Sequence, residues 1–316
     1  MANNVLGIHH VTAIAGDPQK NLDFYTSLLG LRLVKLTVNY DDPGTYHFYY
    51  GDETGRPGTI LTFFPWPGAR RGRRGTGQVT VTSFSVPGGS FGYWTERFKS
   101  QNVLFDEPVR RFDEEVLSFF DPDGMALELV ACSDTRSPWK DSPVPHDHAI
   151  RGFYSVTITV EGYERTASLL TEVMGFRHAK EDGNRFRYEV GAGGVGAVVD
   201  VQCLPSGAMG KVAVGTVHHI AWRVANGDEQ NALRQDIVRF GLNVTPVINR
   251  KYFHSIYFRE PGHVLFEIAT DVPGFAVDEK QEQLGMKLQL PPWLESQRTK
   301  IEQVLPPLQL SKSRER

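Results

Sequence analysis

The fold is decided by IHHVTAIA at residues 8–15 and VHHIAWRV at residues 217–224, two versions of one segment with a pair of histidines at the same place in each. Two further segments, TVTSFSV at 80–86 and YSVTITV at 154–160, have the same apolar and β-branched character without the histidines. Runs of this kind, rich in Val, Ile and Thr, are typical of β-strands. The sequence therefore contains four copies of one structural unit, each of which begins with one of these strands.

A stretch with helical periodicity follows each predicted strand. The four stretches are residues 22–34, 91–103, 167–176 and 232–242. In the first of them, apolar residues recur at positions i, i+3 and i+4, which predicts an amphipathic helix. Glycines stand where a left-handed residue can close a helix. They are Gly30, Gly175 and Gly241.

Three strand-like segments come after each helix, so the repeating unit is βαβββ. In the second copy they are residues 103–109, 116–121 and 125–131, and in the fourth copy 242–248, 255–260 and 263–270. Pro/Gly turns, DPDG at 121–124 and EPGH at 260–263, join the last two segments of these copies. A single unit cannot bury its exposed sheet face, so the units are expected to pair.

The sequence thus predicts an α+β fold of four βαβββ modules that close into two cup-shaped, eight-stranded mixed sheets. The modules are expected at residues 5–66, 78–132, 151–204 and 215–271, with a C-terminal tail of one or two short helices at 272–316. The Arg- and Gly-rich stretch 67–77 and the Pro-rich stretch 133–152 are expected to be linkers. The arginines of the first linker belong to a solvated loop, or alternatively to a flap near the mouth of a cup. They are Arg70, Arg71, Arg73 and Arg74.

The composition is that of an ordinary globular chain. With 40% hydrophobic and 22% charged residues among 316, disorder, coiled coil and collagen are excluded. A net charge of −3 gives no reason to expect a nucleic-acid or membrane partner. Two cysteines, Cys132 and Cys203, supply neither a disulfide framework nor a Cys-based zinc site. Neither a membrane-spanning apolar run nor a signal peptide is recognisable, so a cytoplasmic protein is expected.

One histidine of each pair lies five residues before the last residue of its strand. We call this position the ligand slot of each copy. The slot holds His10 and His219 in copies 1 and 4, but Val81 and Ser155 in copies 2 and 3. Glu267 lies in the last strand of copy 4. Two neutral imidazoles and one carboxylate form a set that leaves coordination positions open on Fe(II). A lone histidine is more often an ordinary core residue, but the matched placement favours His10, His219 and Glu267 as metal ligands.

The ligand positions also predict which copies pair. If neighbouring copies paired, His10 would share a cup with Glu128, and His219 with Glu267, and two ligands hold a divalent metal poorly. If copy 1 pairs with copy 4, one cup collects all three ligands, and its fourth slot, within residues 60–64, has no acid and is expected to be apolar and open. We therefore expect modules 1 and 4 to form the metal cup. Modules 2 and 3 form a cup without metal, in which Glu128 is structural or solvent-facing. An exchange of copies between two subunits would bring the same ligands together.

These features resemble the vicinal oxygen chelate superfamily of glyoxalases, bleomycin-resistance proteins and extradiol dioxygenases. Four segments are more closely similar to hydroquinone ring-cleaving dioxygenases of the dichlorohydroquinone 1,2-dioxygenase type. They are YHFYYGDETGRPGT (46–59), HAIRGFYS (148–155), GNRFRYEV (183–190) and KYFHSIYFREPGHVLFE (251–267). The resemblance covers about residues 5–290. It implies a non-haem Fe(II) enzyme that cleaves a small hydroquinone-type or catechol-type aromatic with O₂, with the three predicted ligands holding the iron.

The resemblance also implies further site residues, each of which has a plainer explanation. They are Thr12, Tyr257, Arg250, His9 and His218. Thr12 shares a strand face with His10 but could simply pack there, and Tyr257 could donate a proton to a bound oxygen or be a core residue. Arg250 could neutralise a phenolate or form a surface salt bridge. His9 and His218 should point away from the metal by strand alternation, unless a bulge or a strand end turns them. Other histidines are expected to be polar loop or strand residues, namely His47, His146, His148 and His254.

Two other functions stay open at this point. A glyoxalase-type isomerase or thiol transferase would use Mn, Zn or Ni, commonly with a fourth protein ligand, for which copy 1 offers no acid. A metal-free binding or resistance protein of the same fold is disfavoured by the two histidine pairs and Glu267. A homo-oligomer is possible. The arginine run has neither the spacing of a phosphate loop nor the interleaved aromatics of a nucleic-acid site.

Overall fold

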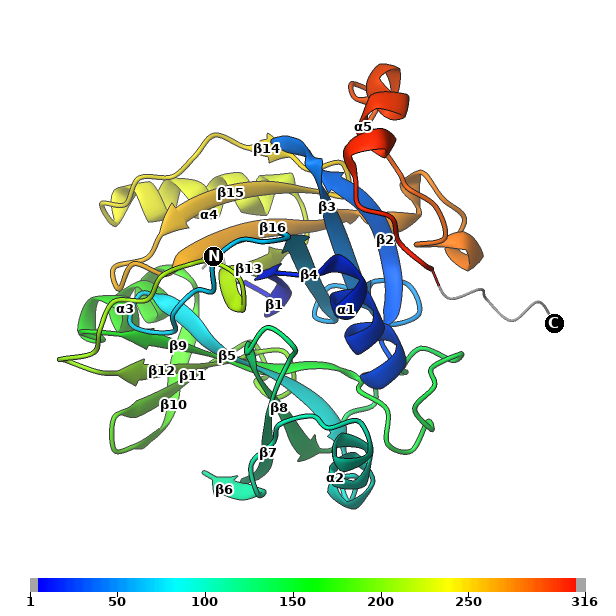
Figure 1. Cartoon of the computed structure of the whole chain (residues 1–316). Coiled ribbons are helices and arrows are strands. Elements are labelled where there is room, and N and C mark those ends of the chain that lie inside the picture. The colour runs from blue at the N-terminus through cyan, green and yellow to red at the C-terminus, as the bar shows by residue number, and fades with distance from the viewer. Residues whose placement is uncertain (1–4, 311–316) are drawn as a thin grey trace.

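Two curved eight-stranded sheets lie one above the other in the computed structural model, which describes residues 5–310 (Figure 1). The first sheet runs in the order β14 (Ile248–Asn249), β15 (Phe253–Arg259), β16 (Leu265–Pro273), β13 (Thr216–Val224), β1 (Ile8–Ala15), β4 (Ile60–Pro65), β3 (Asp42–Gly51), β2 (Arg32–Asn39). The second runs in the order β10 (Phe176–Asp182), β11 (Arg185–Val190), β12 (Val198–Cys203), β9 (Gly152–Val160), β5 (Gln78–Pro87), β8 (Ala126–Cys132), β7 (Glu114–Phe120), β6 (Val109–Arg111). The predicted fold class is confirmed.

An antiparallel pair of strands stands at the middle of each sheet and joins segments that are far apart in the chain. In the first sheet β1 pairs with β13, with Thr12 opposite His219 and His10 opposite Ala221. In the second sheet β5 pairs with β9, with Ser83 opposite Ser155. The first sheet therefore combines the strands of residues 8–65 with those of residues 216–273.

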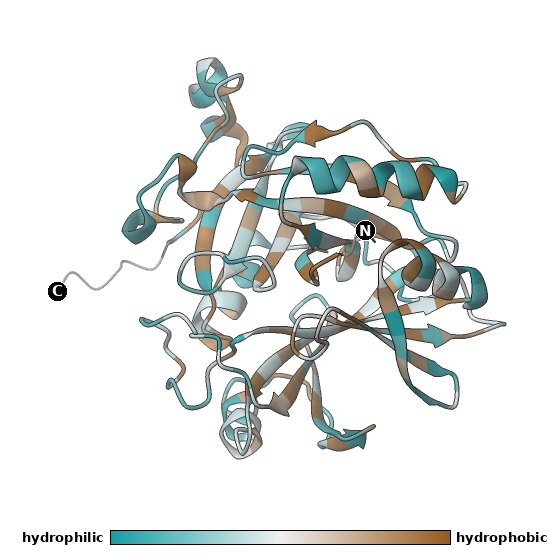
Figure 2. Cartoon of the chain, turned by 180° about the vertical axis from the view of Figure 1, so that it is seen from behind, coloured by the Kyte–Doolittle hydropathy of each residue, from teal (hydrophilic) through white to brown (hydrophobic). Residues whose placement is uncertain are grey.

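Strand alternation divides each sheet into an apolar and a polar face. On β1, Val11 and Ala13 belong to the large apolar core, which also contains Trp94 and Trp222. The helices cover this core. Helix α4 (Gly227–Arg239) buries Leu233 and Ile237 against the first sheet, while its outward side is largely hydrophilic (Figure 2). The other face carries most of the polar residues of the central strands, together with a smaller apolar cluster that includes Ala221 and Ile60.

The helices do not coincide with the stretches that the sequence periodicity predicts; α4, for example, begins at Gly227 rather than at residue 232. The other segments are α1 (Pro18–Asp23) with the π-turn η1 (Phe24–Leu28), α2 (Phe91–Ser100), and α3 (Glu164–Ser168) with the π-turn η2 (Leu169–Val173). Gly30 closes the first helix in a left-handed conformation at φ 73°, as predicted, so the last residues of the expected stretch 22–34 lie beyond the helix and enter β2. Asp17 caps the start of α1 by accepting a hydrogen bond from the Lys20 amide at 2.9 Å.

The predicted strands 103–109 and 242–248 are mostly irregular. Only β6 and β14 remain of them, at the outer edges of the two sheets. Pro108 and Pro246 interrupt these segments, and proline cannot donate a ladder hydrogen bond. The two edge strands β6 and β14 are therefore short.

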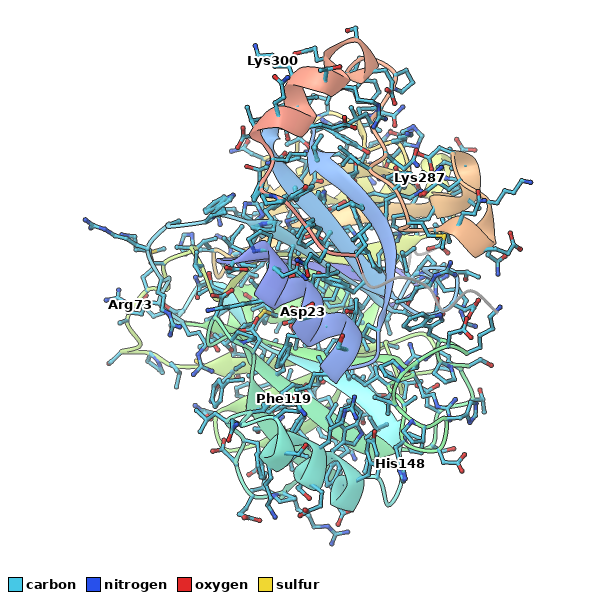
Figure 3. All side chains as sticks on the ribbon, turned by 45° about the vertical axis from the view of Figure 1, so that its right-hand side comes forward. Asp23, Arg73, Phe119, His148, Lys287 and Lys300 are labelled. Carbon is cyan, nitrogen blue, oxygen red and sulfur yellow. The ribbon has the colours of Figure 1, made fainter. Side chains whose placement is uncertain are left out.

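The stretches that lead from one sheet to the other run side by side. In residues 67–77, the Gly72 amide donates to the Val214 carbonyl at 2.8 Å and the Arg73 amide to the Lys211 carbonyl at 3.0 Å. The Arg73 side chain is exposed and stands at the margin of the molecule, whereas Phe119 lies inside it (Figure 3). The arginine-rich stretch is thus a paired linker on the surface.

The C-terminal segment packs against the β2 edge of the first sheet. It contains the 3₁₀ turns η3 (Phe275–Val277), η4 (Gln281–Gln283) and η5 (Glu295–Gln297), followed by α5 (Arg298–Val304). The Gln289 amide donates to the Leu36 carbonyl at 2.9 Å, and Thr37 Oγ1 donates to the Gln289 carbonyl at 2.6 Å. Strand β16 extends two residues into the expected tail, and residues 311–316 of that tail, like residues 1–4, lie outside the described part of the chain. Between residues 5 and 310, no helix is long and apolar enough to cross a membrane.

A fully buried lysine fastens this segment to β2. Lys35 Nζ lies 2.7 Å from Asp278 Oδ1 and also contacts Glu279 Oε2. Its ammonium group stands over the Tyr252 ring, 4.9 Å from the centroid. Both carboxylates that compensate the charge of Lys35 therefore follow the last strand.

Replacing Lys35 with Met should lower the free energy of unfolding by about 3 kcal/mol, because it leaves the buried Glu279 carboxylate without its partner. Denaturant titration measures the loss. Lys99→Met is the matched control, since its ion pair with Glu96 is exposed and should contribute less than about 1 kcal/mol. Equal losses in the two variants would contradict the anchoring role.

Candidate metal centre

Three side chains from three neighbouring strands converge on one point of the first sheet. His10 comes from β1, His219 from β13 and Glu267 from β16, and all are buried. The two Nε2 atoms lie 3.3 Å apart, and Glu267 Oε2 lies 3.3 Å from that of His10 and 2.9 Å from that of His219. The sheet thus brings together the three residues that the sequence analysis proposed as ligands. They form the one cluster of potential metal ligands found among residues 5–310.

The hydrogen bonding of Glu267 leaves one of its oxygens free for a cation. Oε1 accepts a hydrogen bond from Ser255 Oγ at 2.5 Å, whereas Oε2 is buried without a hydrogen-bond partner. Burial lowers the pKa of His219, which favours the neutral imidazole with a lone pair. A carboxylate oxygen and two imidazole nitrogens that meet in this way suit a divalent metal ion.

His9 and His218 are the extra residues of two β-bulges. The register of β1 and β13 shifts between Ile8 and His10, so that His9 is unpaired, and again between Thr12 and Ala13, where His218 is left over. Each of these histidines contacts the rear nitrogen of its neighbour. His9 Nδ1 lies 2.9 Å from His10 Nδ1, and His218 Nδ1 lies 2.8 Å from His219 Nδ1.

These contacts determine the protonation of the two inner imidazoles. If Nε2 of His10 and of His219 carries a lone pair, Nδ1 must carry the hydrogen and donate it to His9 and His218. Burial lowers the pKa of His9 well below its ordinary value and that of His218 to about 3, so both can accept. Strand alternation alone does not predict the positions of His9 and His218, because it takes no account of the two bulges.

Tyr257 and Arg250 form one unit beside the cluster. Tyr257 is opposite Glu267 in the β15–β16 ladder, and its ring stands edge-on to His219 at 5.7 Å between centroids. Arg250 Nε donates to the Tyr257 hydroxyl oxygen at 3.3 Å, and Nη1 donates to Asp41 Oδ2 at 3.0 Å. Burial raises the pKa of Tyr257, which keeps the phenol protonated. Arg250 thus orients the phenol and also makes the surface salt bridge that the sequence left open.

Thr12 is joined to residues that sequence reasoning missed. Thr62 Oγ1 donates to Thr12 Oγ1 at 2.9 Å, His47 Nε2 lies 3.0 Å from Thr62 Oγ1, and the Tyr49 hydroxyl lies 3.0 Å from His47 Nδ1. His47 was expected to be an ordinary strand residue. The available signal is alternation in TYHFYYG (45–51), which places His47 and Tyr49 on the face opposite the core residue Phe48.

The second sheet uses an arginine at the corresponding place. Glu128 is buried, and Arg111 donates to both of its carboxylate oxygens, at 2.8 and 2.6 Å. Ser83 Oγ adds a third hydrogen bond at 2.8 Å. Glu128 is therefore a structural acid, and the alternative of a solvent-facing acid is wrong. The guanidinium group supplies the positive charge that Glu267 lacks.

The other histidines lie in polar surroundings elsewhere. His148 Nδ1 lies 3.3 Å from Ser90 Oγ and its ring stacks on Tyr93, and Arg151 contacts His146. The His254 carbonyl accepts a hydrogen bond from Gln230. These contacts agree with the structural roles expected for the three residues.

Comparisons with known proteins show which family and which relatives this chain is similar to. The family model of the Glyoxalase/Bleomycin resistance protein/Dioxygenase superfamily matches residues 7–129 and 152–268. A Bacillus subtilis protein named "Putative ring-cleaving dioxygenase MhqO" is 49% identical over 98% of this chain and 99% of its own length. The chlorohydroquinone/hydroquinone 1,2-dioxygenase of Sphingobium indicum is 39% identical over 93% of this chain and 94% of its own. A solved Bacillus subtilis structure, 49% identical, superposes with a TM-score of 0.94 over 98% of this chain and 99% of that one.

The arginine of the second sheet allows a stability test. Arg111→Met should lower the free energy of unfolding by about 3 kcal/mol, because it leaves the buried Glu128 carboxylate with a single hydrogen bond. Chemical denaturation of this variant is compared with that of Arg110→Met, in which the neighbouring arginine is exposed. Arg111→Met being no more harmful than Arg110→Met would rule out the compensating role of the guanidinium.

Proposed function

This chain belongs to the Glyoxalase/Bleomycin resistance protein/Dioxygenase superfamily and is a ring-cleaving dioxygenase, and we propose that it uses one Fe(II) and O₂ to open a hydroquinone-type ring. His10, His219 and Glu267 would hold the iron. The hydroquinone assignment follows the name of the Sphingobium indicum relative, and a catechol-type ring is the nearest alternative.

The observation that carries the proposal is the buried Glu267 Oε2 atom, which has no hydrogen-bond partner and faces two imidazole nitrogens. Leaving such an oxygen uncompensated is costly, and a cation at this point removes the cost. Three protein donors on one side leave the remaining coordination positions for substrate and O₂.

The fourth position of the cluster is neutral. Thr62 is opposite Thr12 in the β1–β4 ladder in the same way that Glu267 is opposite Ala221 in the β13–β16 ladder. The slot is therefore polar and hydrogen-bonded, rather than apolar and open as the sequence suggested. A threonine already bonded to Thr12 and His47 is a poor replacement for a fourth carboxylate ligand. This favours the dioxygenase over a glyoxalase-type isomerase or thiol transferase with Mn, Zn or Ni.

The chain's own residues would orient the reactants and handle protons. Bound Fe(II) would supply the electronic coupling between a substrate oxygen and O₂. Tyr257 keeps a proton on its hydroxyl beside His219, where it can donate to a reacting oxygen, while Arg250 fixes the direction of that group. Ser255 holds the rear oxygen of Glu267, and His9 and His218 hold the rear nitrogens of the two imidazoles.

One chain would contain a complete site. All three proposed ligands come from strands of the same sheet within one molecule, so exchange of copies between subunits is not needed. A homo-oligomer would leave this site unchanged in composition. We place the reaction in the cytoplasm, where Cys132 and Cys203 would remain the free thiols that they are here.

The first test is iron stoichiometry. His10→Ala, His219→Ala and Glu267→Gln should each lose bound Fe(II) and the O₂ uptake that hydroquinone elicits, because two remaining ligands hold the ion weakly. Glu128→Gln is the matched control and should keep one iron per chain. Metal analysis and an oxygen electrode give both readouts, with catechol as the second substrate. Full iron occupancy in Glu267→Gln would show that the carboxylate is misassigned, and isomerase or thiol-transfer activity without O₂ uptake would favour the alternative function.

A second test concerns Tyr257. Tyr257→Phe should bind iron normally but lower kcat about 100-fold, the size expected for loss of a positioned proton donor. Tyr46→Phe removes a phenol that donates to the Pro306 carbonyl, away from the cluster, and should leave kcat unchanged. An unaltered rate in Tyr257→Phe would reduce Tyr257 to a packing residue.

A further inference from the structure

A line of four hydrogen-bonding side chains crosses the first sheet and ends beside the proposed metal ligands. It begins at Tyr49 and His47 on β3, passes through Thr62 on β4 and ends at Thr12 on β1. Thr12 lies directly opposite His219 in the β1–β13 ladder. Tyr49, Thr62 and Thr12 are buried, and His47 is half-buried.

The hydrogen bond from Thr62 to Thr12 sets the direction of the others in this line. Thr62 Oγ1 donates its single hydrogen to Thr12, so it must accept from His47 Nε2. A neutral imidazole has one N–H, so His47 Nδ1 then carries a lone pair and accepts from the Tyr49 hydroxyl. Burial lowers the pKa of His47 and raises that of Tyr49, which keeps both groups neutral.

The last hydroxyl of the line has a hydrogen to spare. Thr12 Oγ1 accepts from Thr62, and no acceptor for its own hydrogen occurs within residues 5–310. Since Thr12 lies opposite one proposed ligand and two residues from another, that hydrogen is available to a molecule bound at the metal. Cooperative hydrogen bonding along the line makes Thr12 a stronger donor.

The second sheet places charged residues at the equivalent positions. Asp200 is opposite Thr157 there, as Thr62 is opposite Thr12, and Arg187 is opposite Asp200, as Tyr49 is opposite Thr62. Arg187 binds Asp200 through two hydrogen bonds, at 2.7 and 3.0 Å. The same scaffold thus accommodates an ion pair, whereas the first sheet carries a neutral donor line beside its carboxylate.

We propose that Tyr49, His47 and Thr62 are positioning residues that commit the Thr12 hydroxyl to donate to the metal-bound oxygen of the substrate, and that they thereby select a ring that binds as an oxygen anion. The inference rests on the proposed function. A phenolate oxygen accepts the hydrogen bond that Thr12 has to give, whereas reversal of the line would need the other tautomer of His47 and a new acceptor for the Tyr49 hydroxyl hydrogen. Thr12 would touch the substrate, and the other three would act through it.

The test removes the middle of the line without changing its shape. Thr62→Val keeps the volume and loses the hydroxyl, whereas Thr62→Ser keeps the hydroxyl. Dissociation constants of phenol and thiophenol are measured with the Fe(II)-loaded enzyme in the absence of O₂. Thr62→Val should weaken phenol binding about 10-fold, because the Thr12 hydroxyl loses the donor that fixes its direction and can turn away from the charged substrate oxygen. Thiophenol, whose sulfur is a poor acceptor, should lose less than about 3-fold, and Thr62→Ser should resemble the wild type for both.

Two further variants separate this effect from general damage. His47→Gln can still donate to Thr62 and accept from Tyr49, and should retain phenol binding, whereas His47→Leu should lose it. Thr159→Val breaks the Thr80–Thr159 hydrogen bond, 2.7 Å long, in the second sheet and should leave phenol binding unchanged. Iron content should be that of the wild type in all of these variants.

The outcomes distinguish the inference from the function on which it rests. Wild-type enzyme that holds no iron and consumes no O₂ with quinols would overturn the proposed function. Wild-type enzyme that is active, with phenol binding unaltered in Thr62→Val, would overturn the donor line alone. Equal losses for phenol and thiophenol, or loss of iron in Thr62→Val, would also overturn it, because either result indicates a structural effect on the site.

Discussion

The antiparallel pairing of β1 with β13 is the constraint on which the rest of the structure depends. It joins His10 to His219, residues that are 209 positions apart in the chain, and unites the strands of residues 8–65 with those of residues 216–273 in one sheet. Strand β16 then adds Glu267 by pairing with β13 in parallel. A slip of one residue in this pair would turn His219 and Glu267 to the face opposite that of His10. The two bulges in the β1–β13 pair allow both histidines of each HH motif to contact each other while the inner one keeps its place.

Much of this arrangement can be predicted from the sequence, because it depends on repetition. The shared position of the HH pairs and the spacing to Glu267 are sufficient to infer the fold class and the residues of the cluster. The bulges are not visible in the sequence, since a register shift depends on the partner strand, and so His9 and His218 could not be placed. The left-handed glycines that follow the helices, Gly30 among them, are predictable because they act locally, whereas the predicted edge strands were wrong because prolines interrupt them.

The role of His47 could not be predicted from the sequence for a different reason. Alternation places it on the same face as Tyr49, but many strand histidines share a face with polar neighbours and have no further role. Its importance comes from Thr62, which lies on another strand and is recognisable only once β3, β4 and β1 are adjacent. Arg111 likewise could not be assigned to Glu128 from sequence, because it lies on a short edge strand whose register nothing in the sequence sets.

The two sheets differ in how each neutralises a buried carboxylate. In the second sheet, the guanidinium group of Arg111 belongs to the chain itself. It binds both carboxylate oxygens of Glu128, so neither oxygen is free for a metal ion. In the first sheet, Glu267 keeps one oxygen free, and the groups around it are neutral imidazoles, phenols and hydroxyls. The nearby cation, Arg250, is already engaged by Asp41 and Tyr257. With a divalent ion in place, the charge of this site would be one positive unit, and an oxygen anion from the substrate would be the natural ligand to cancel it.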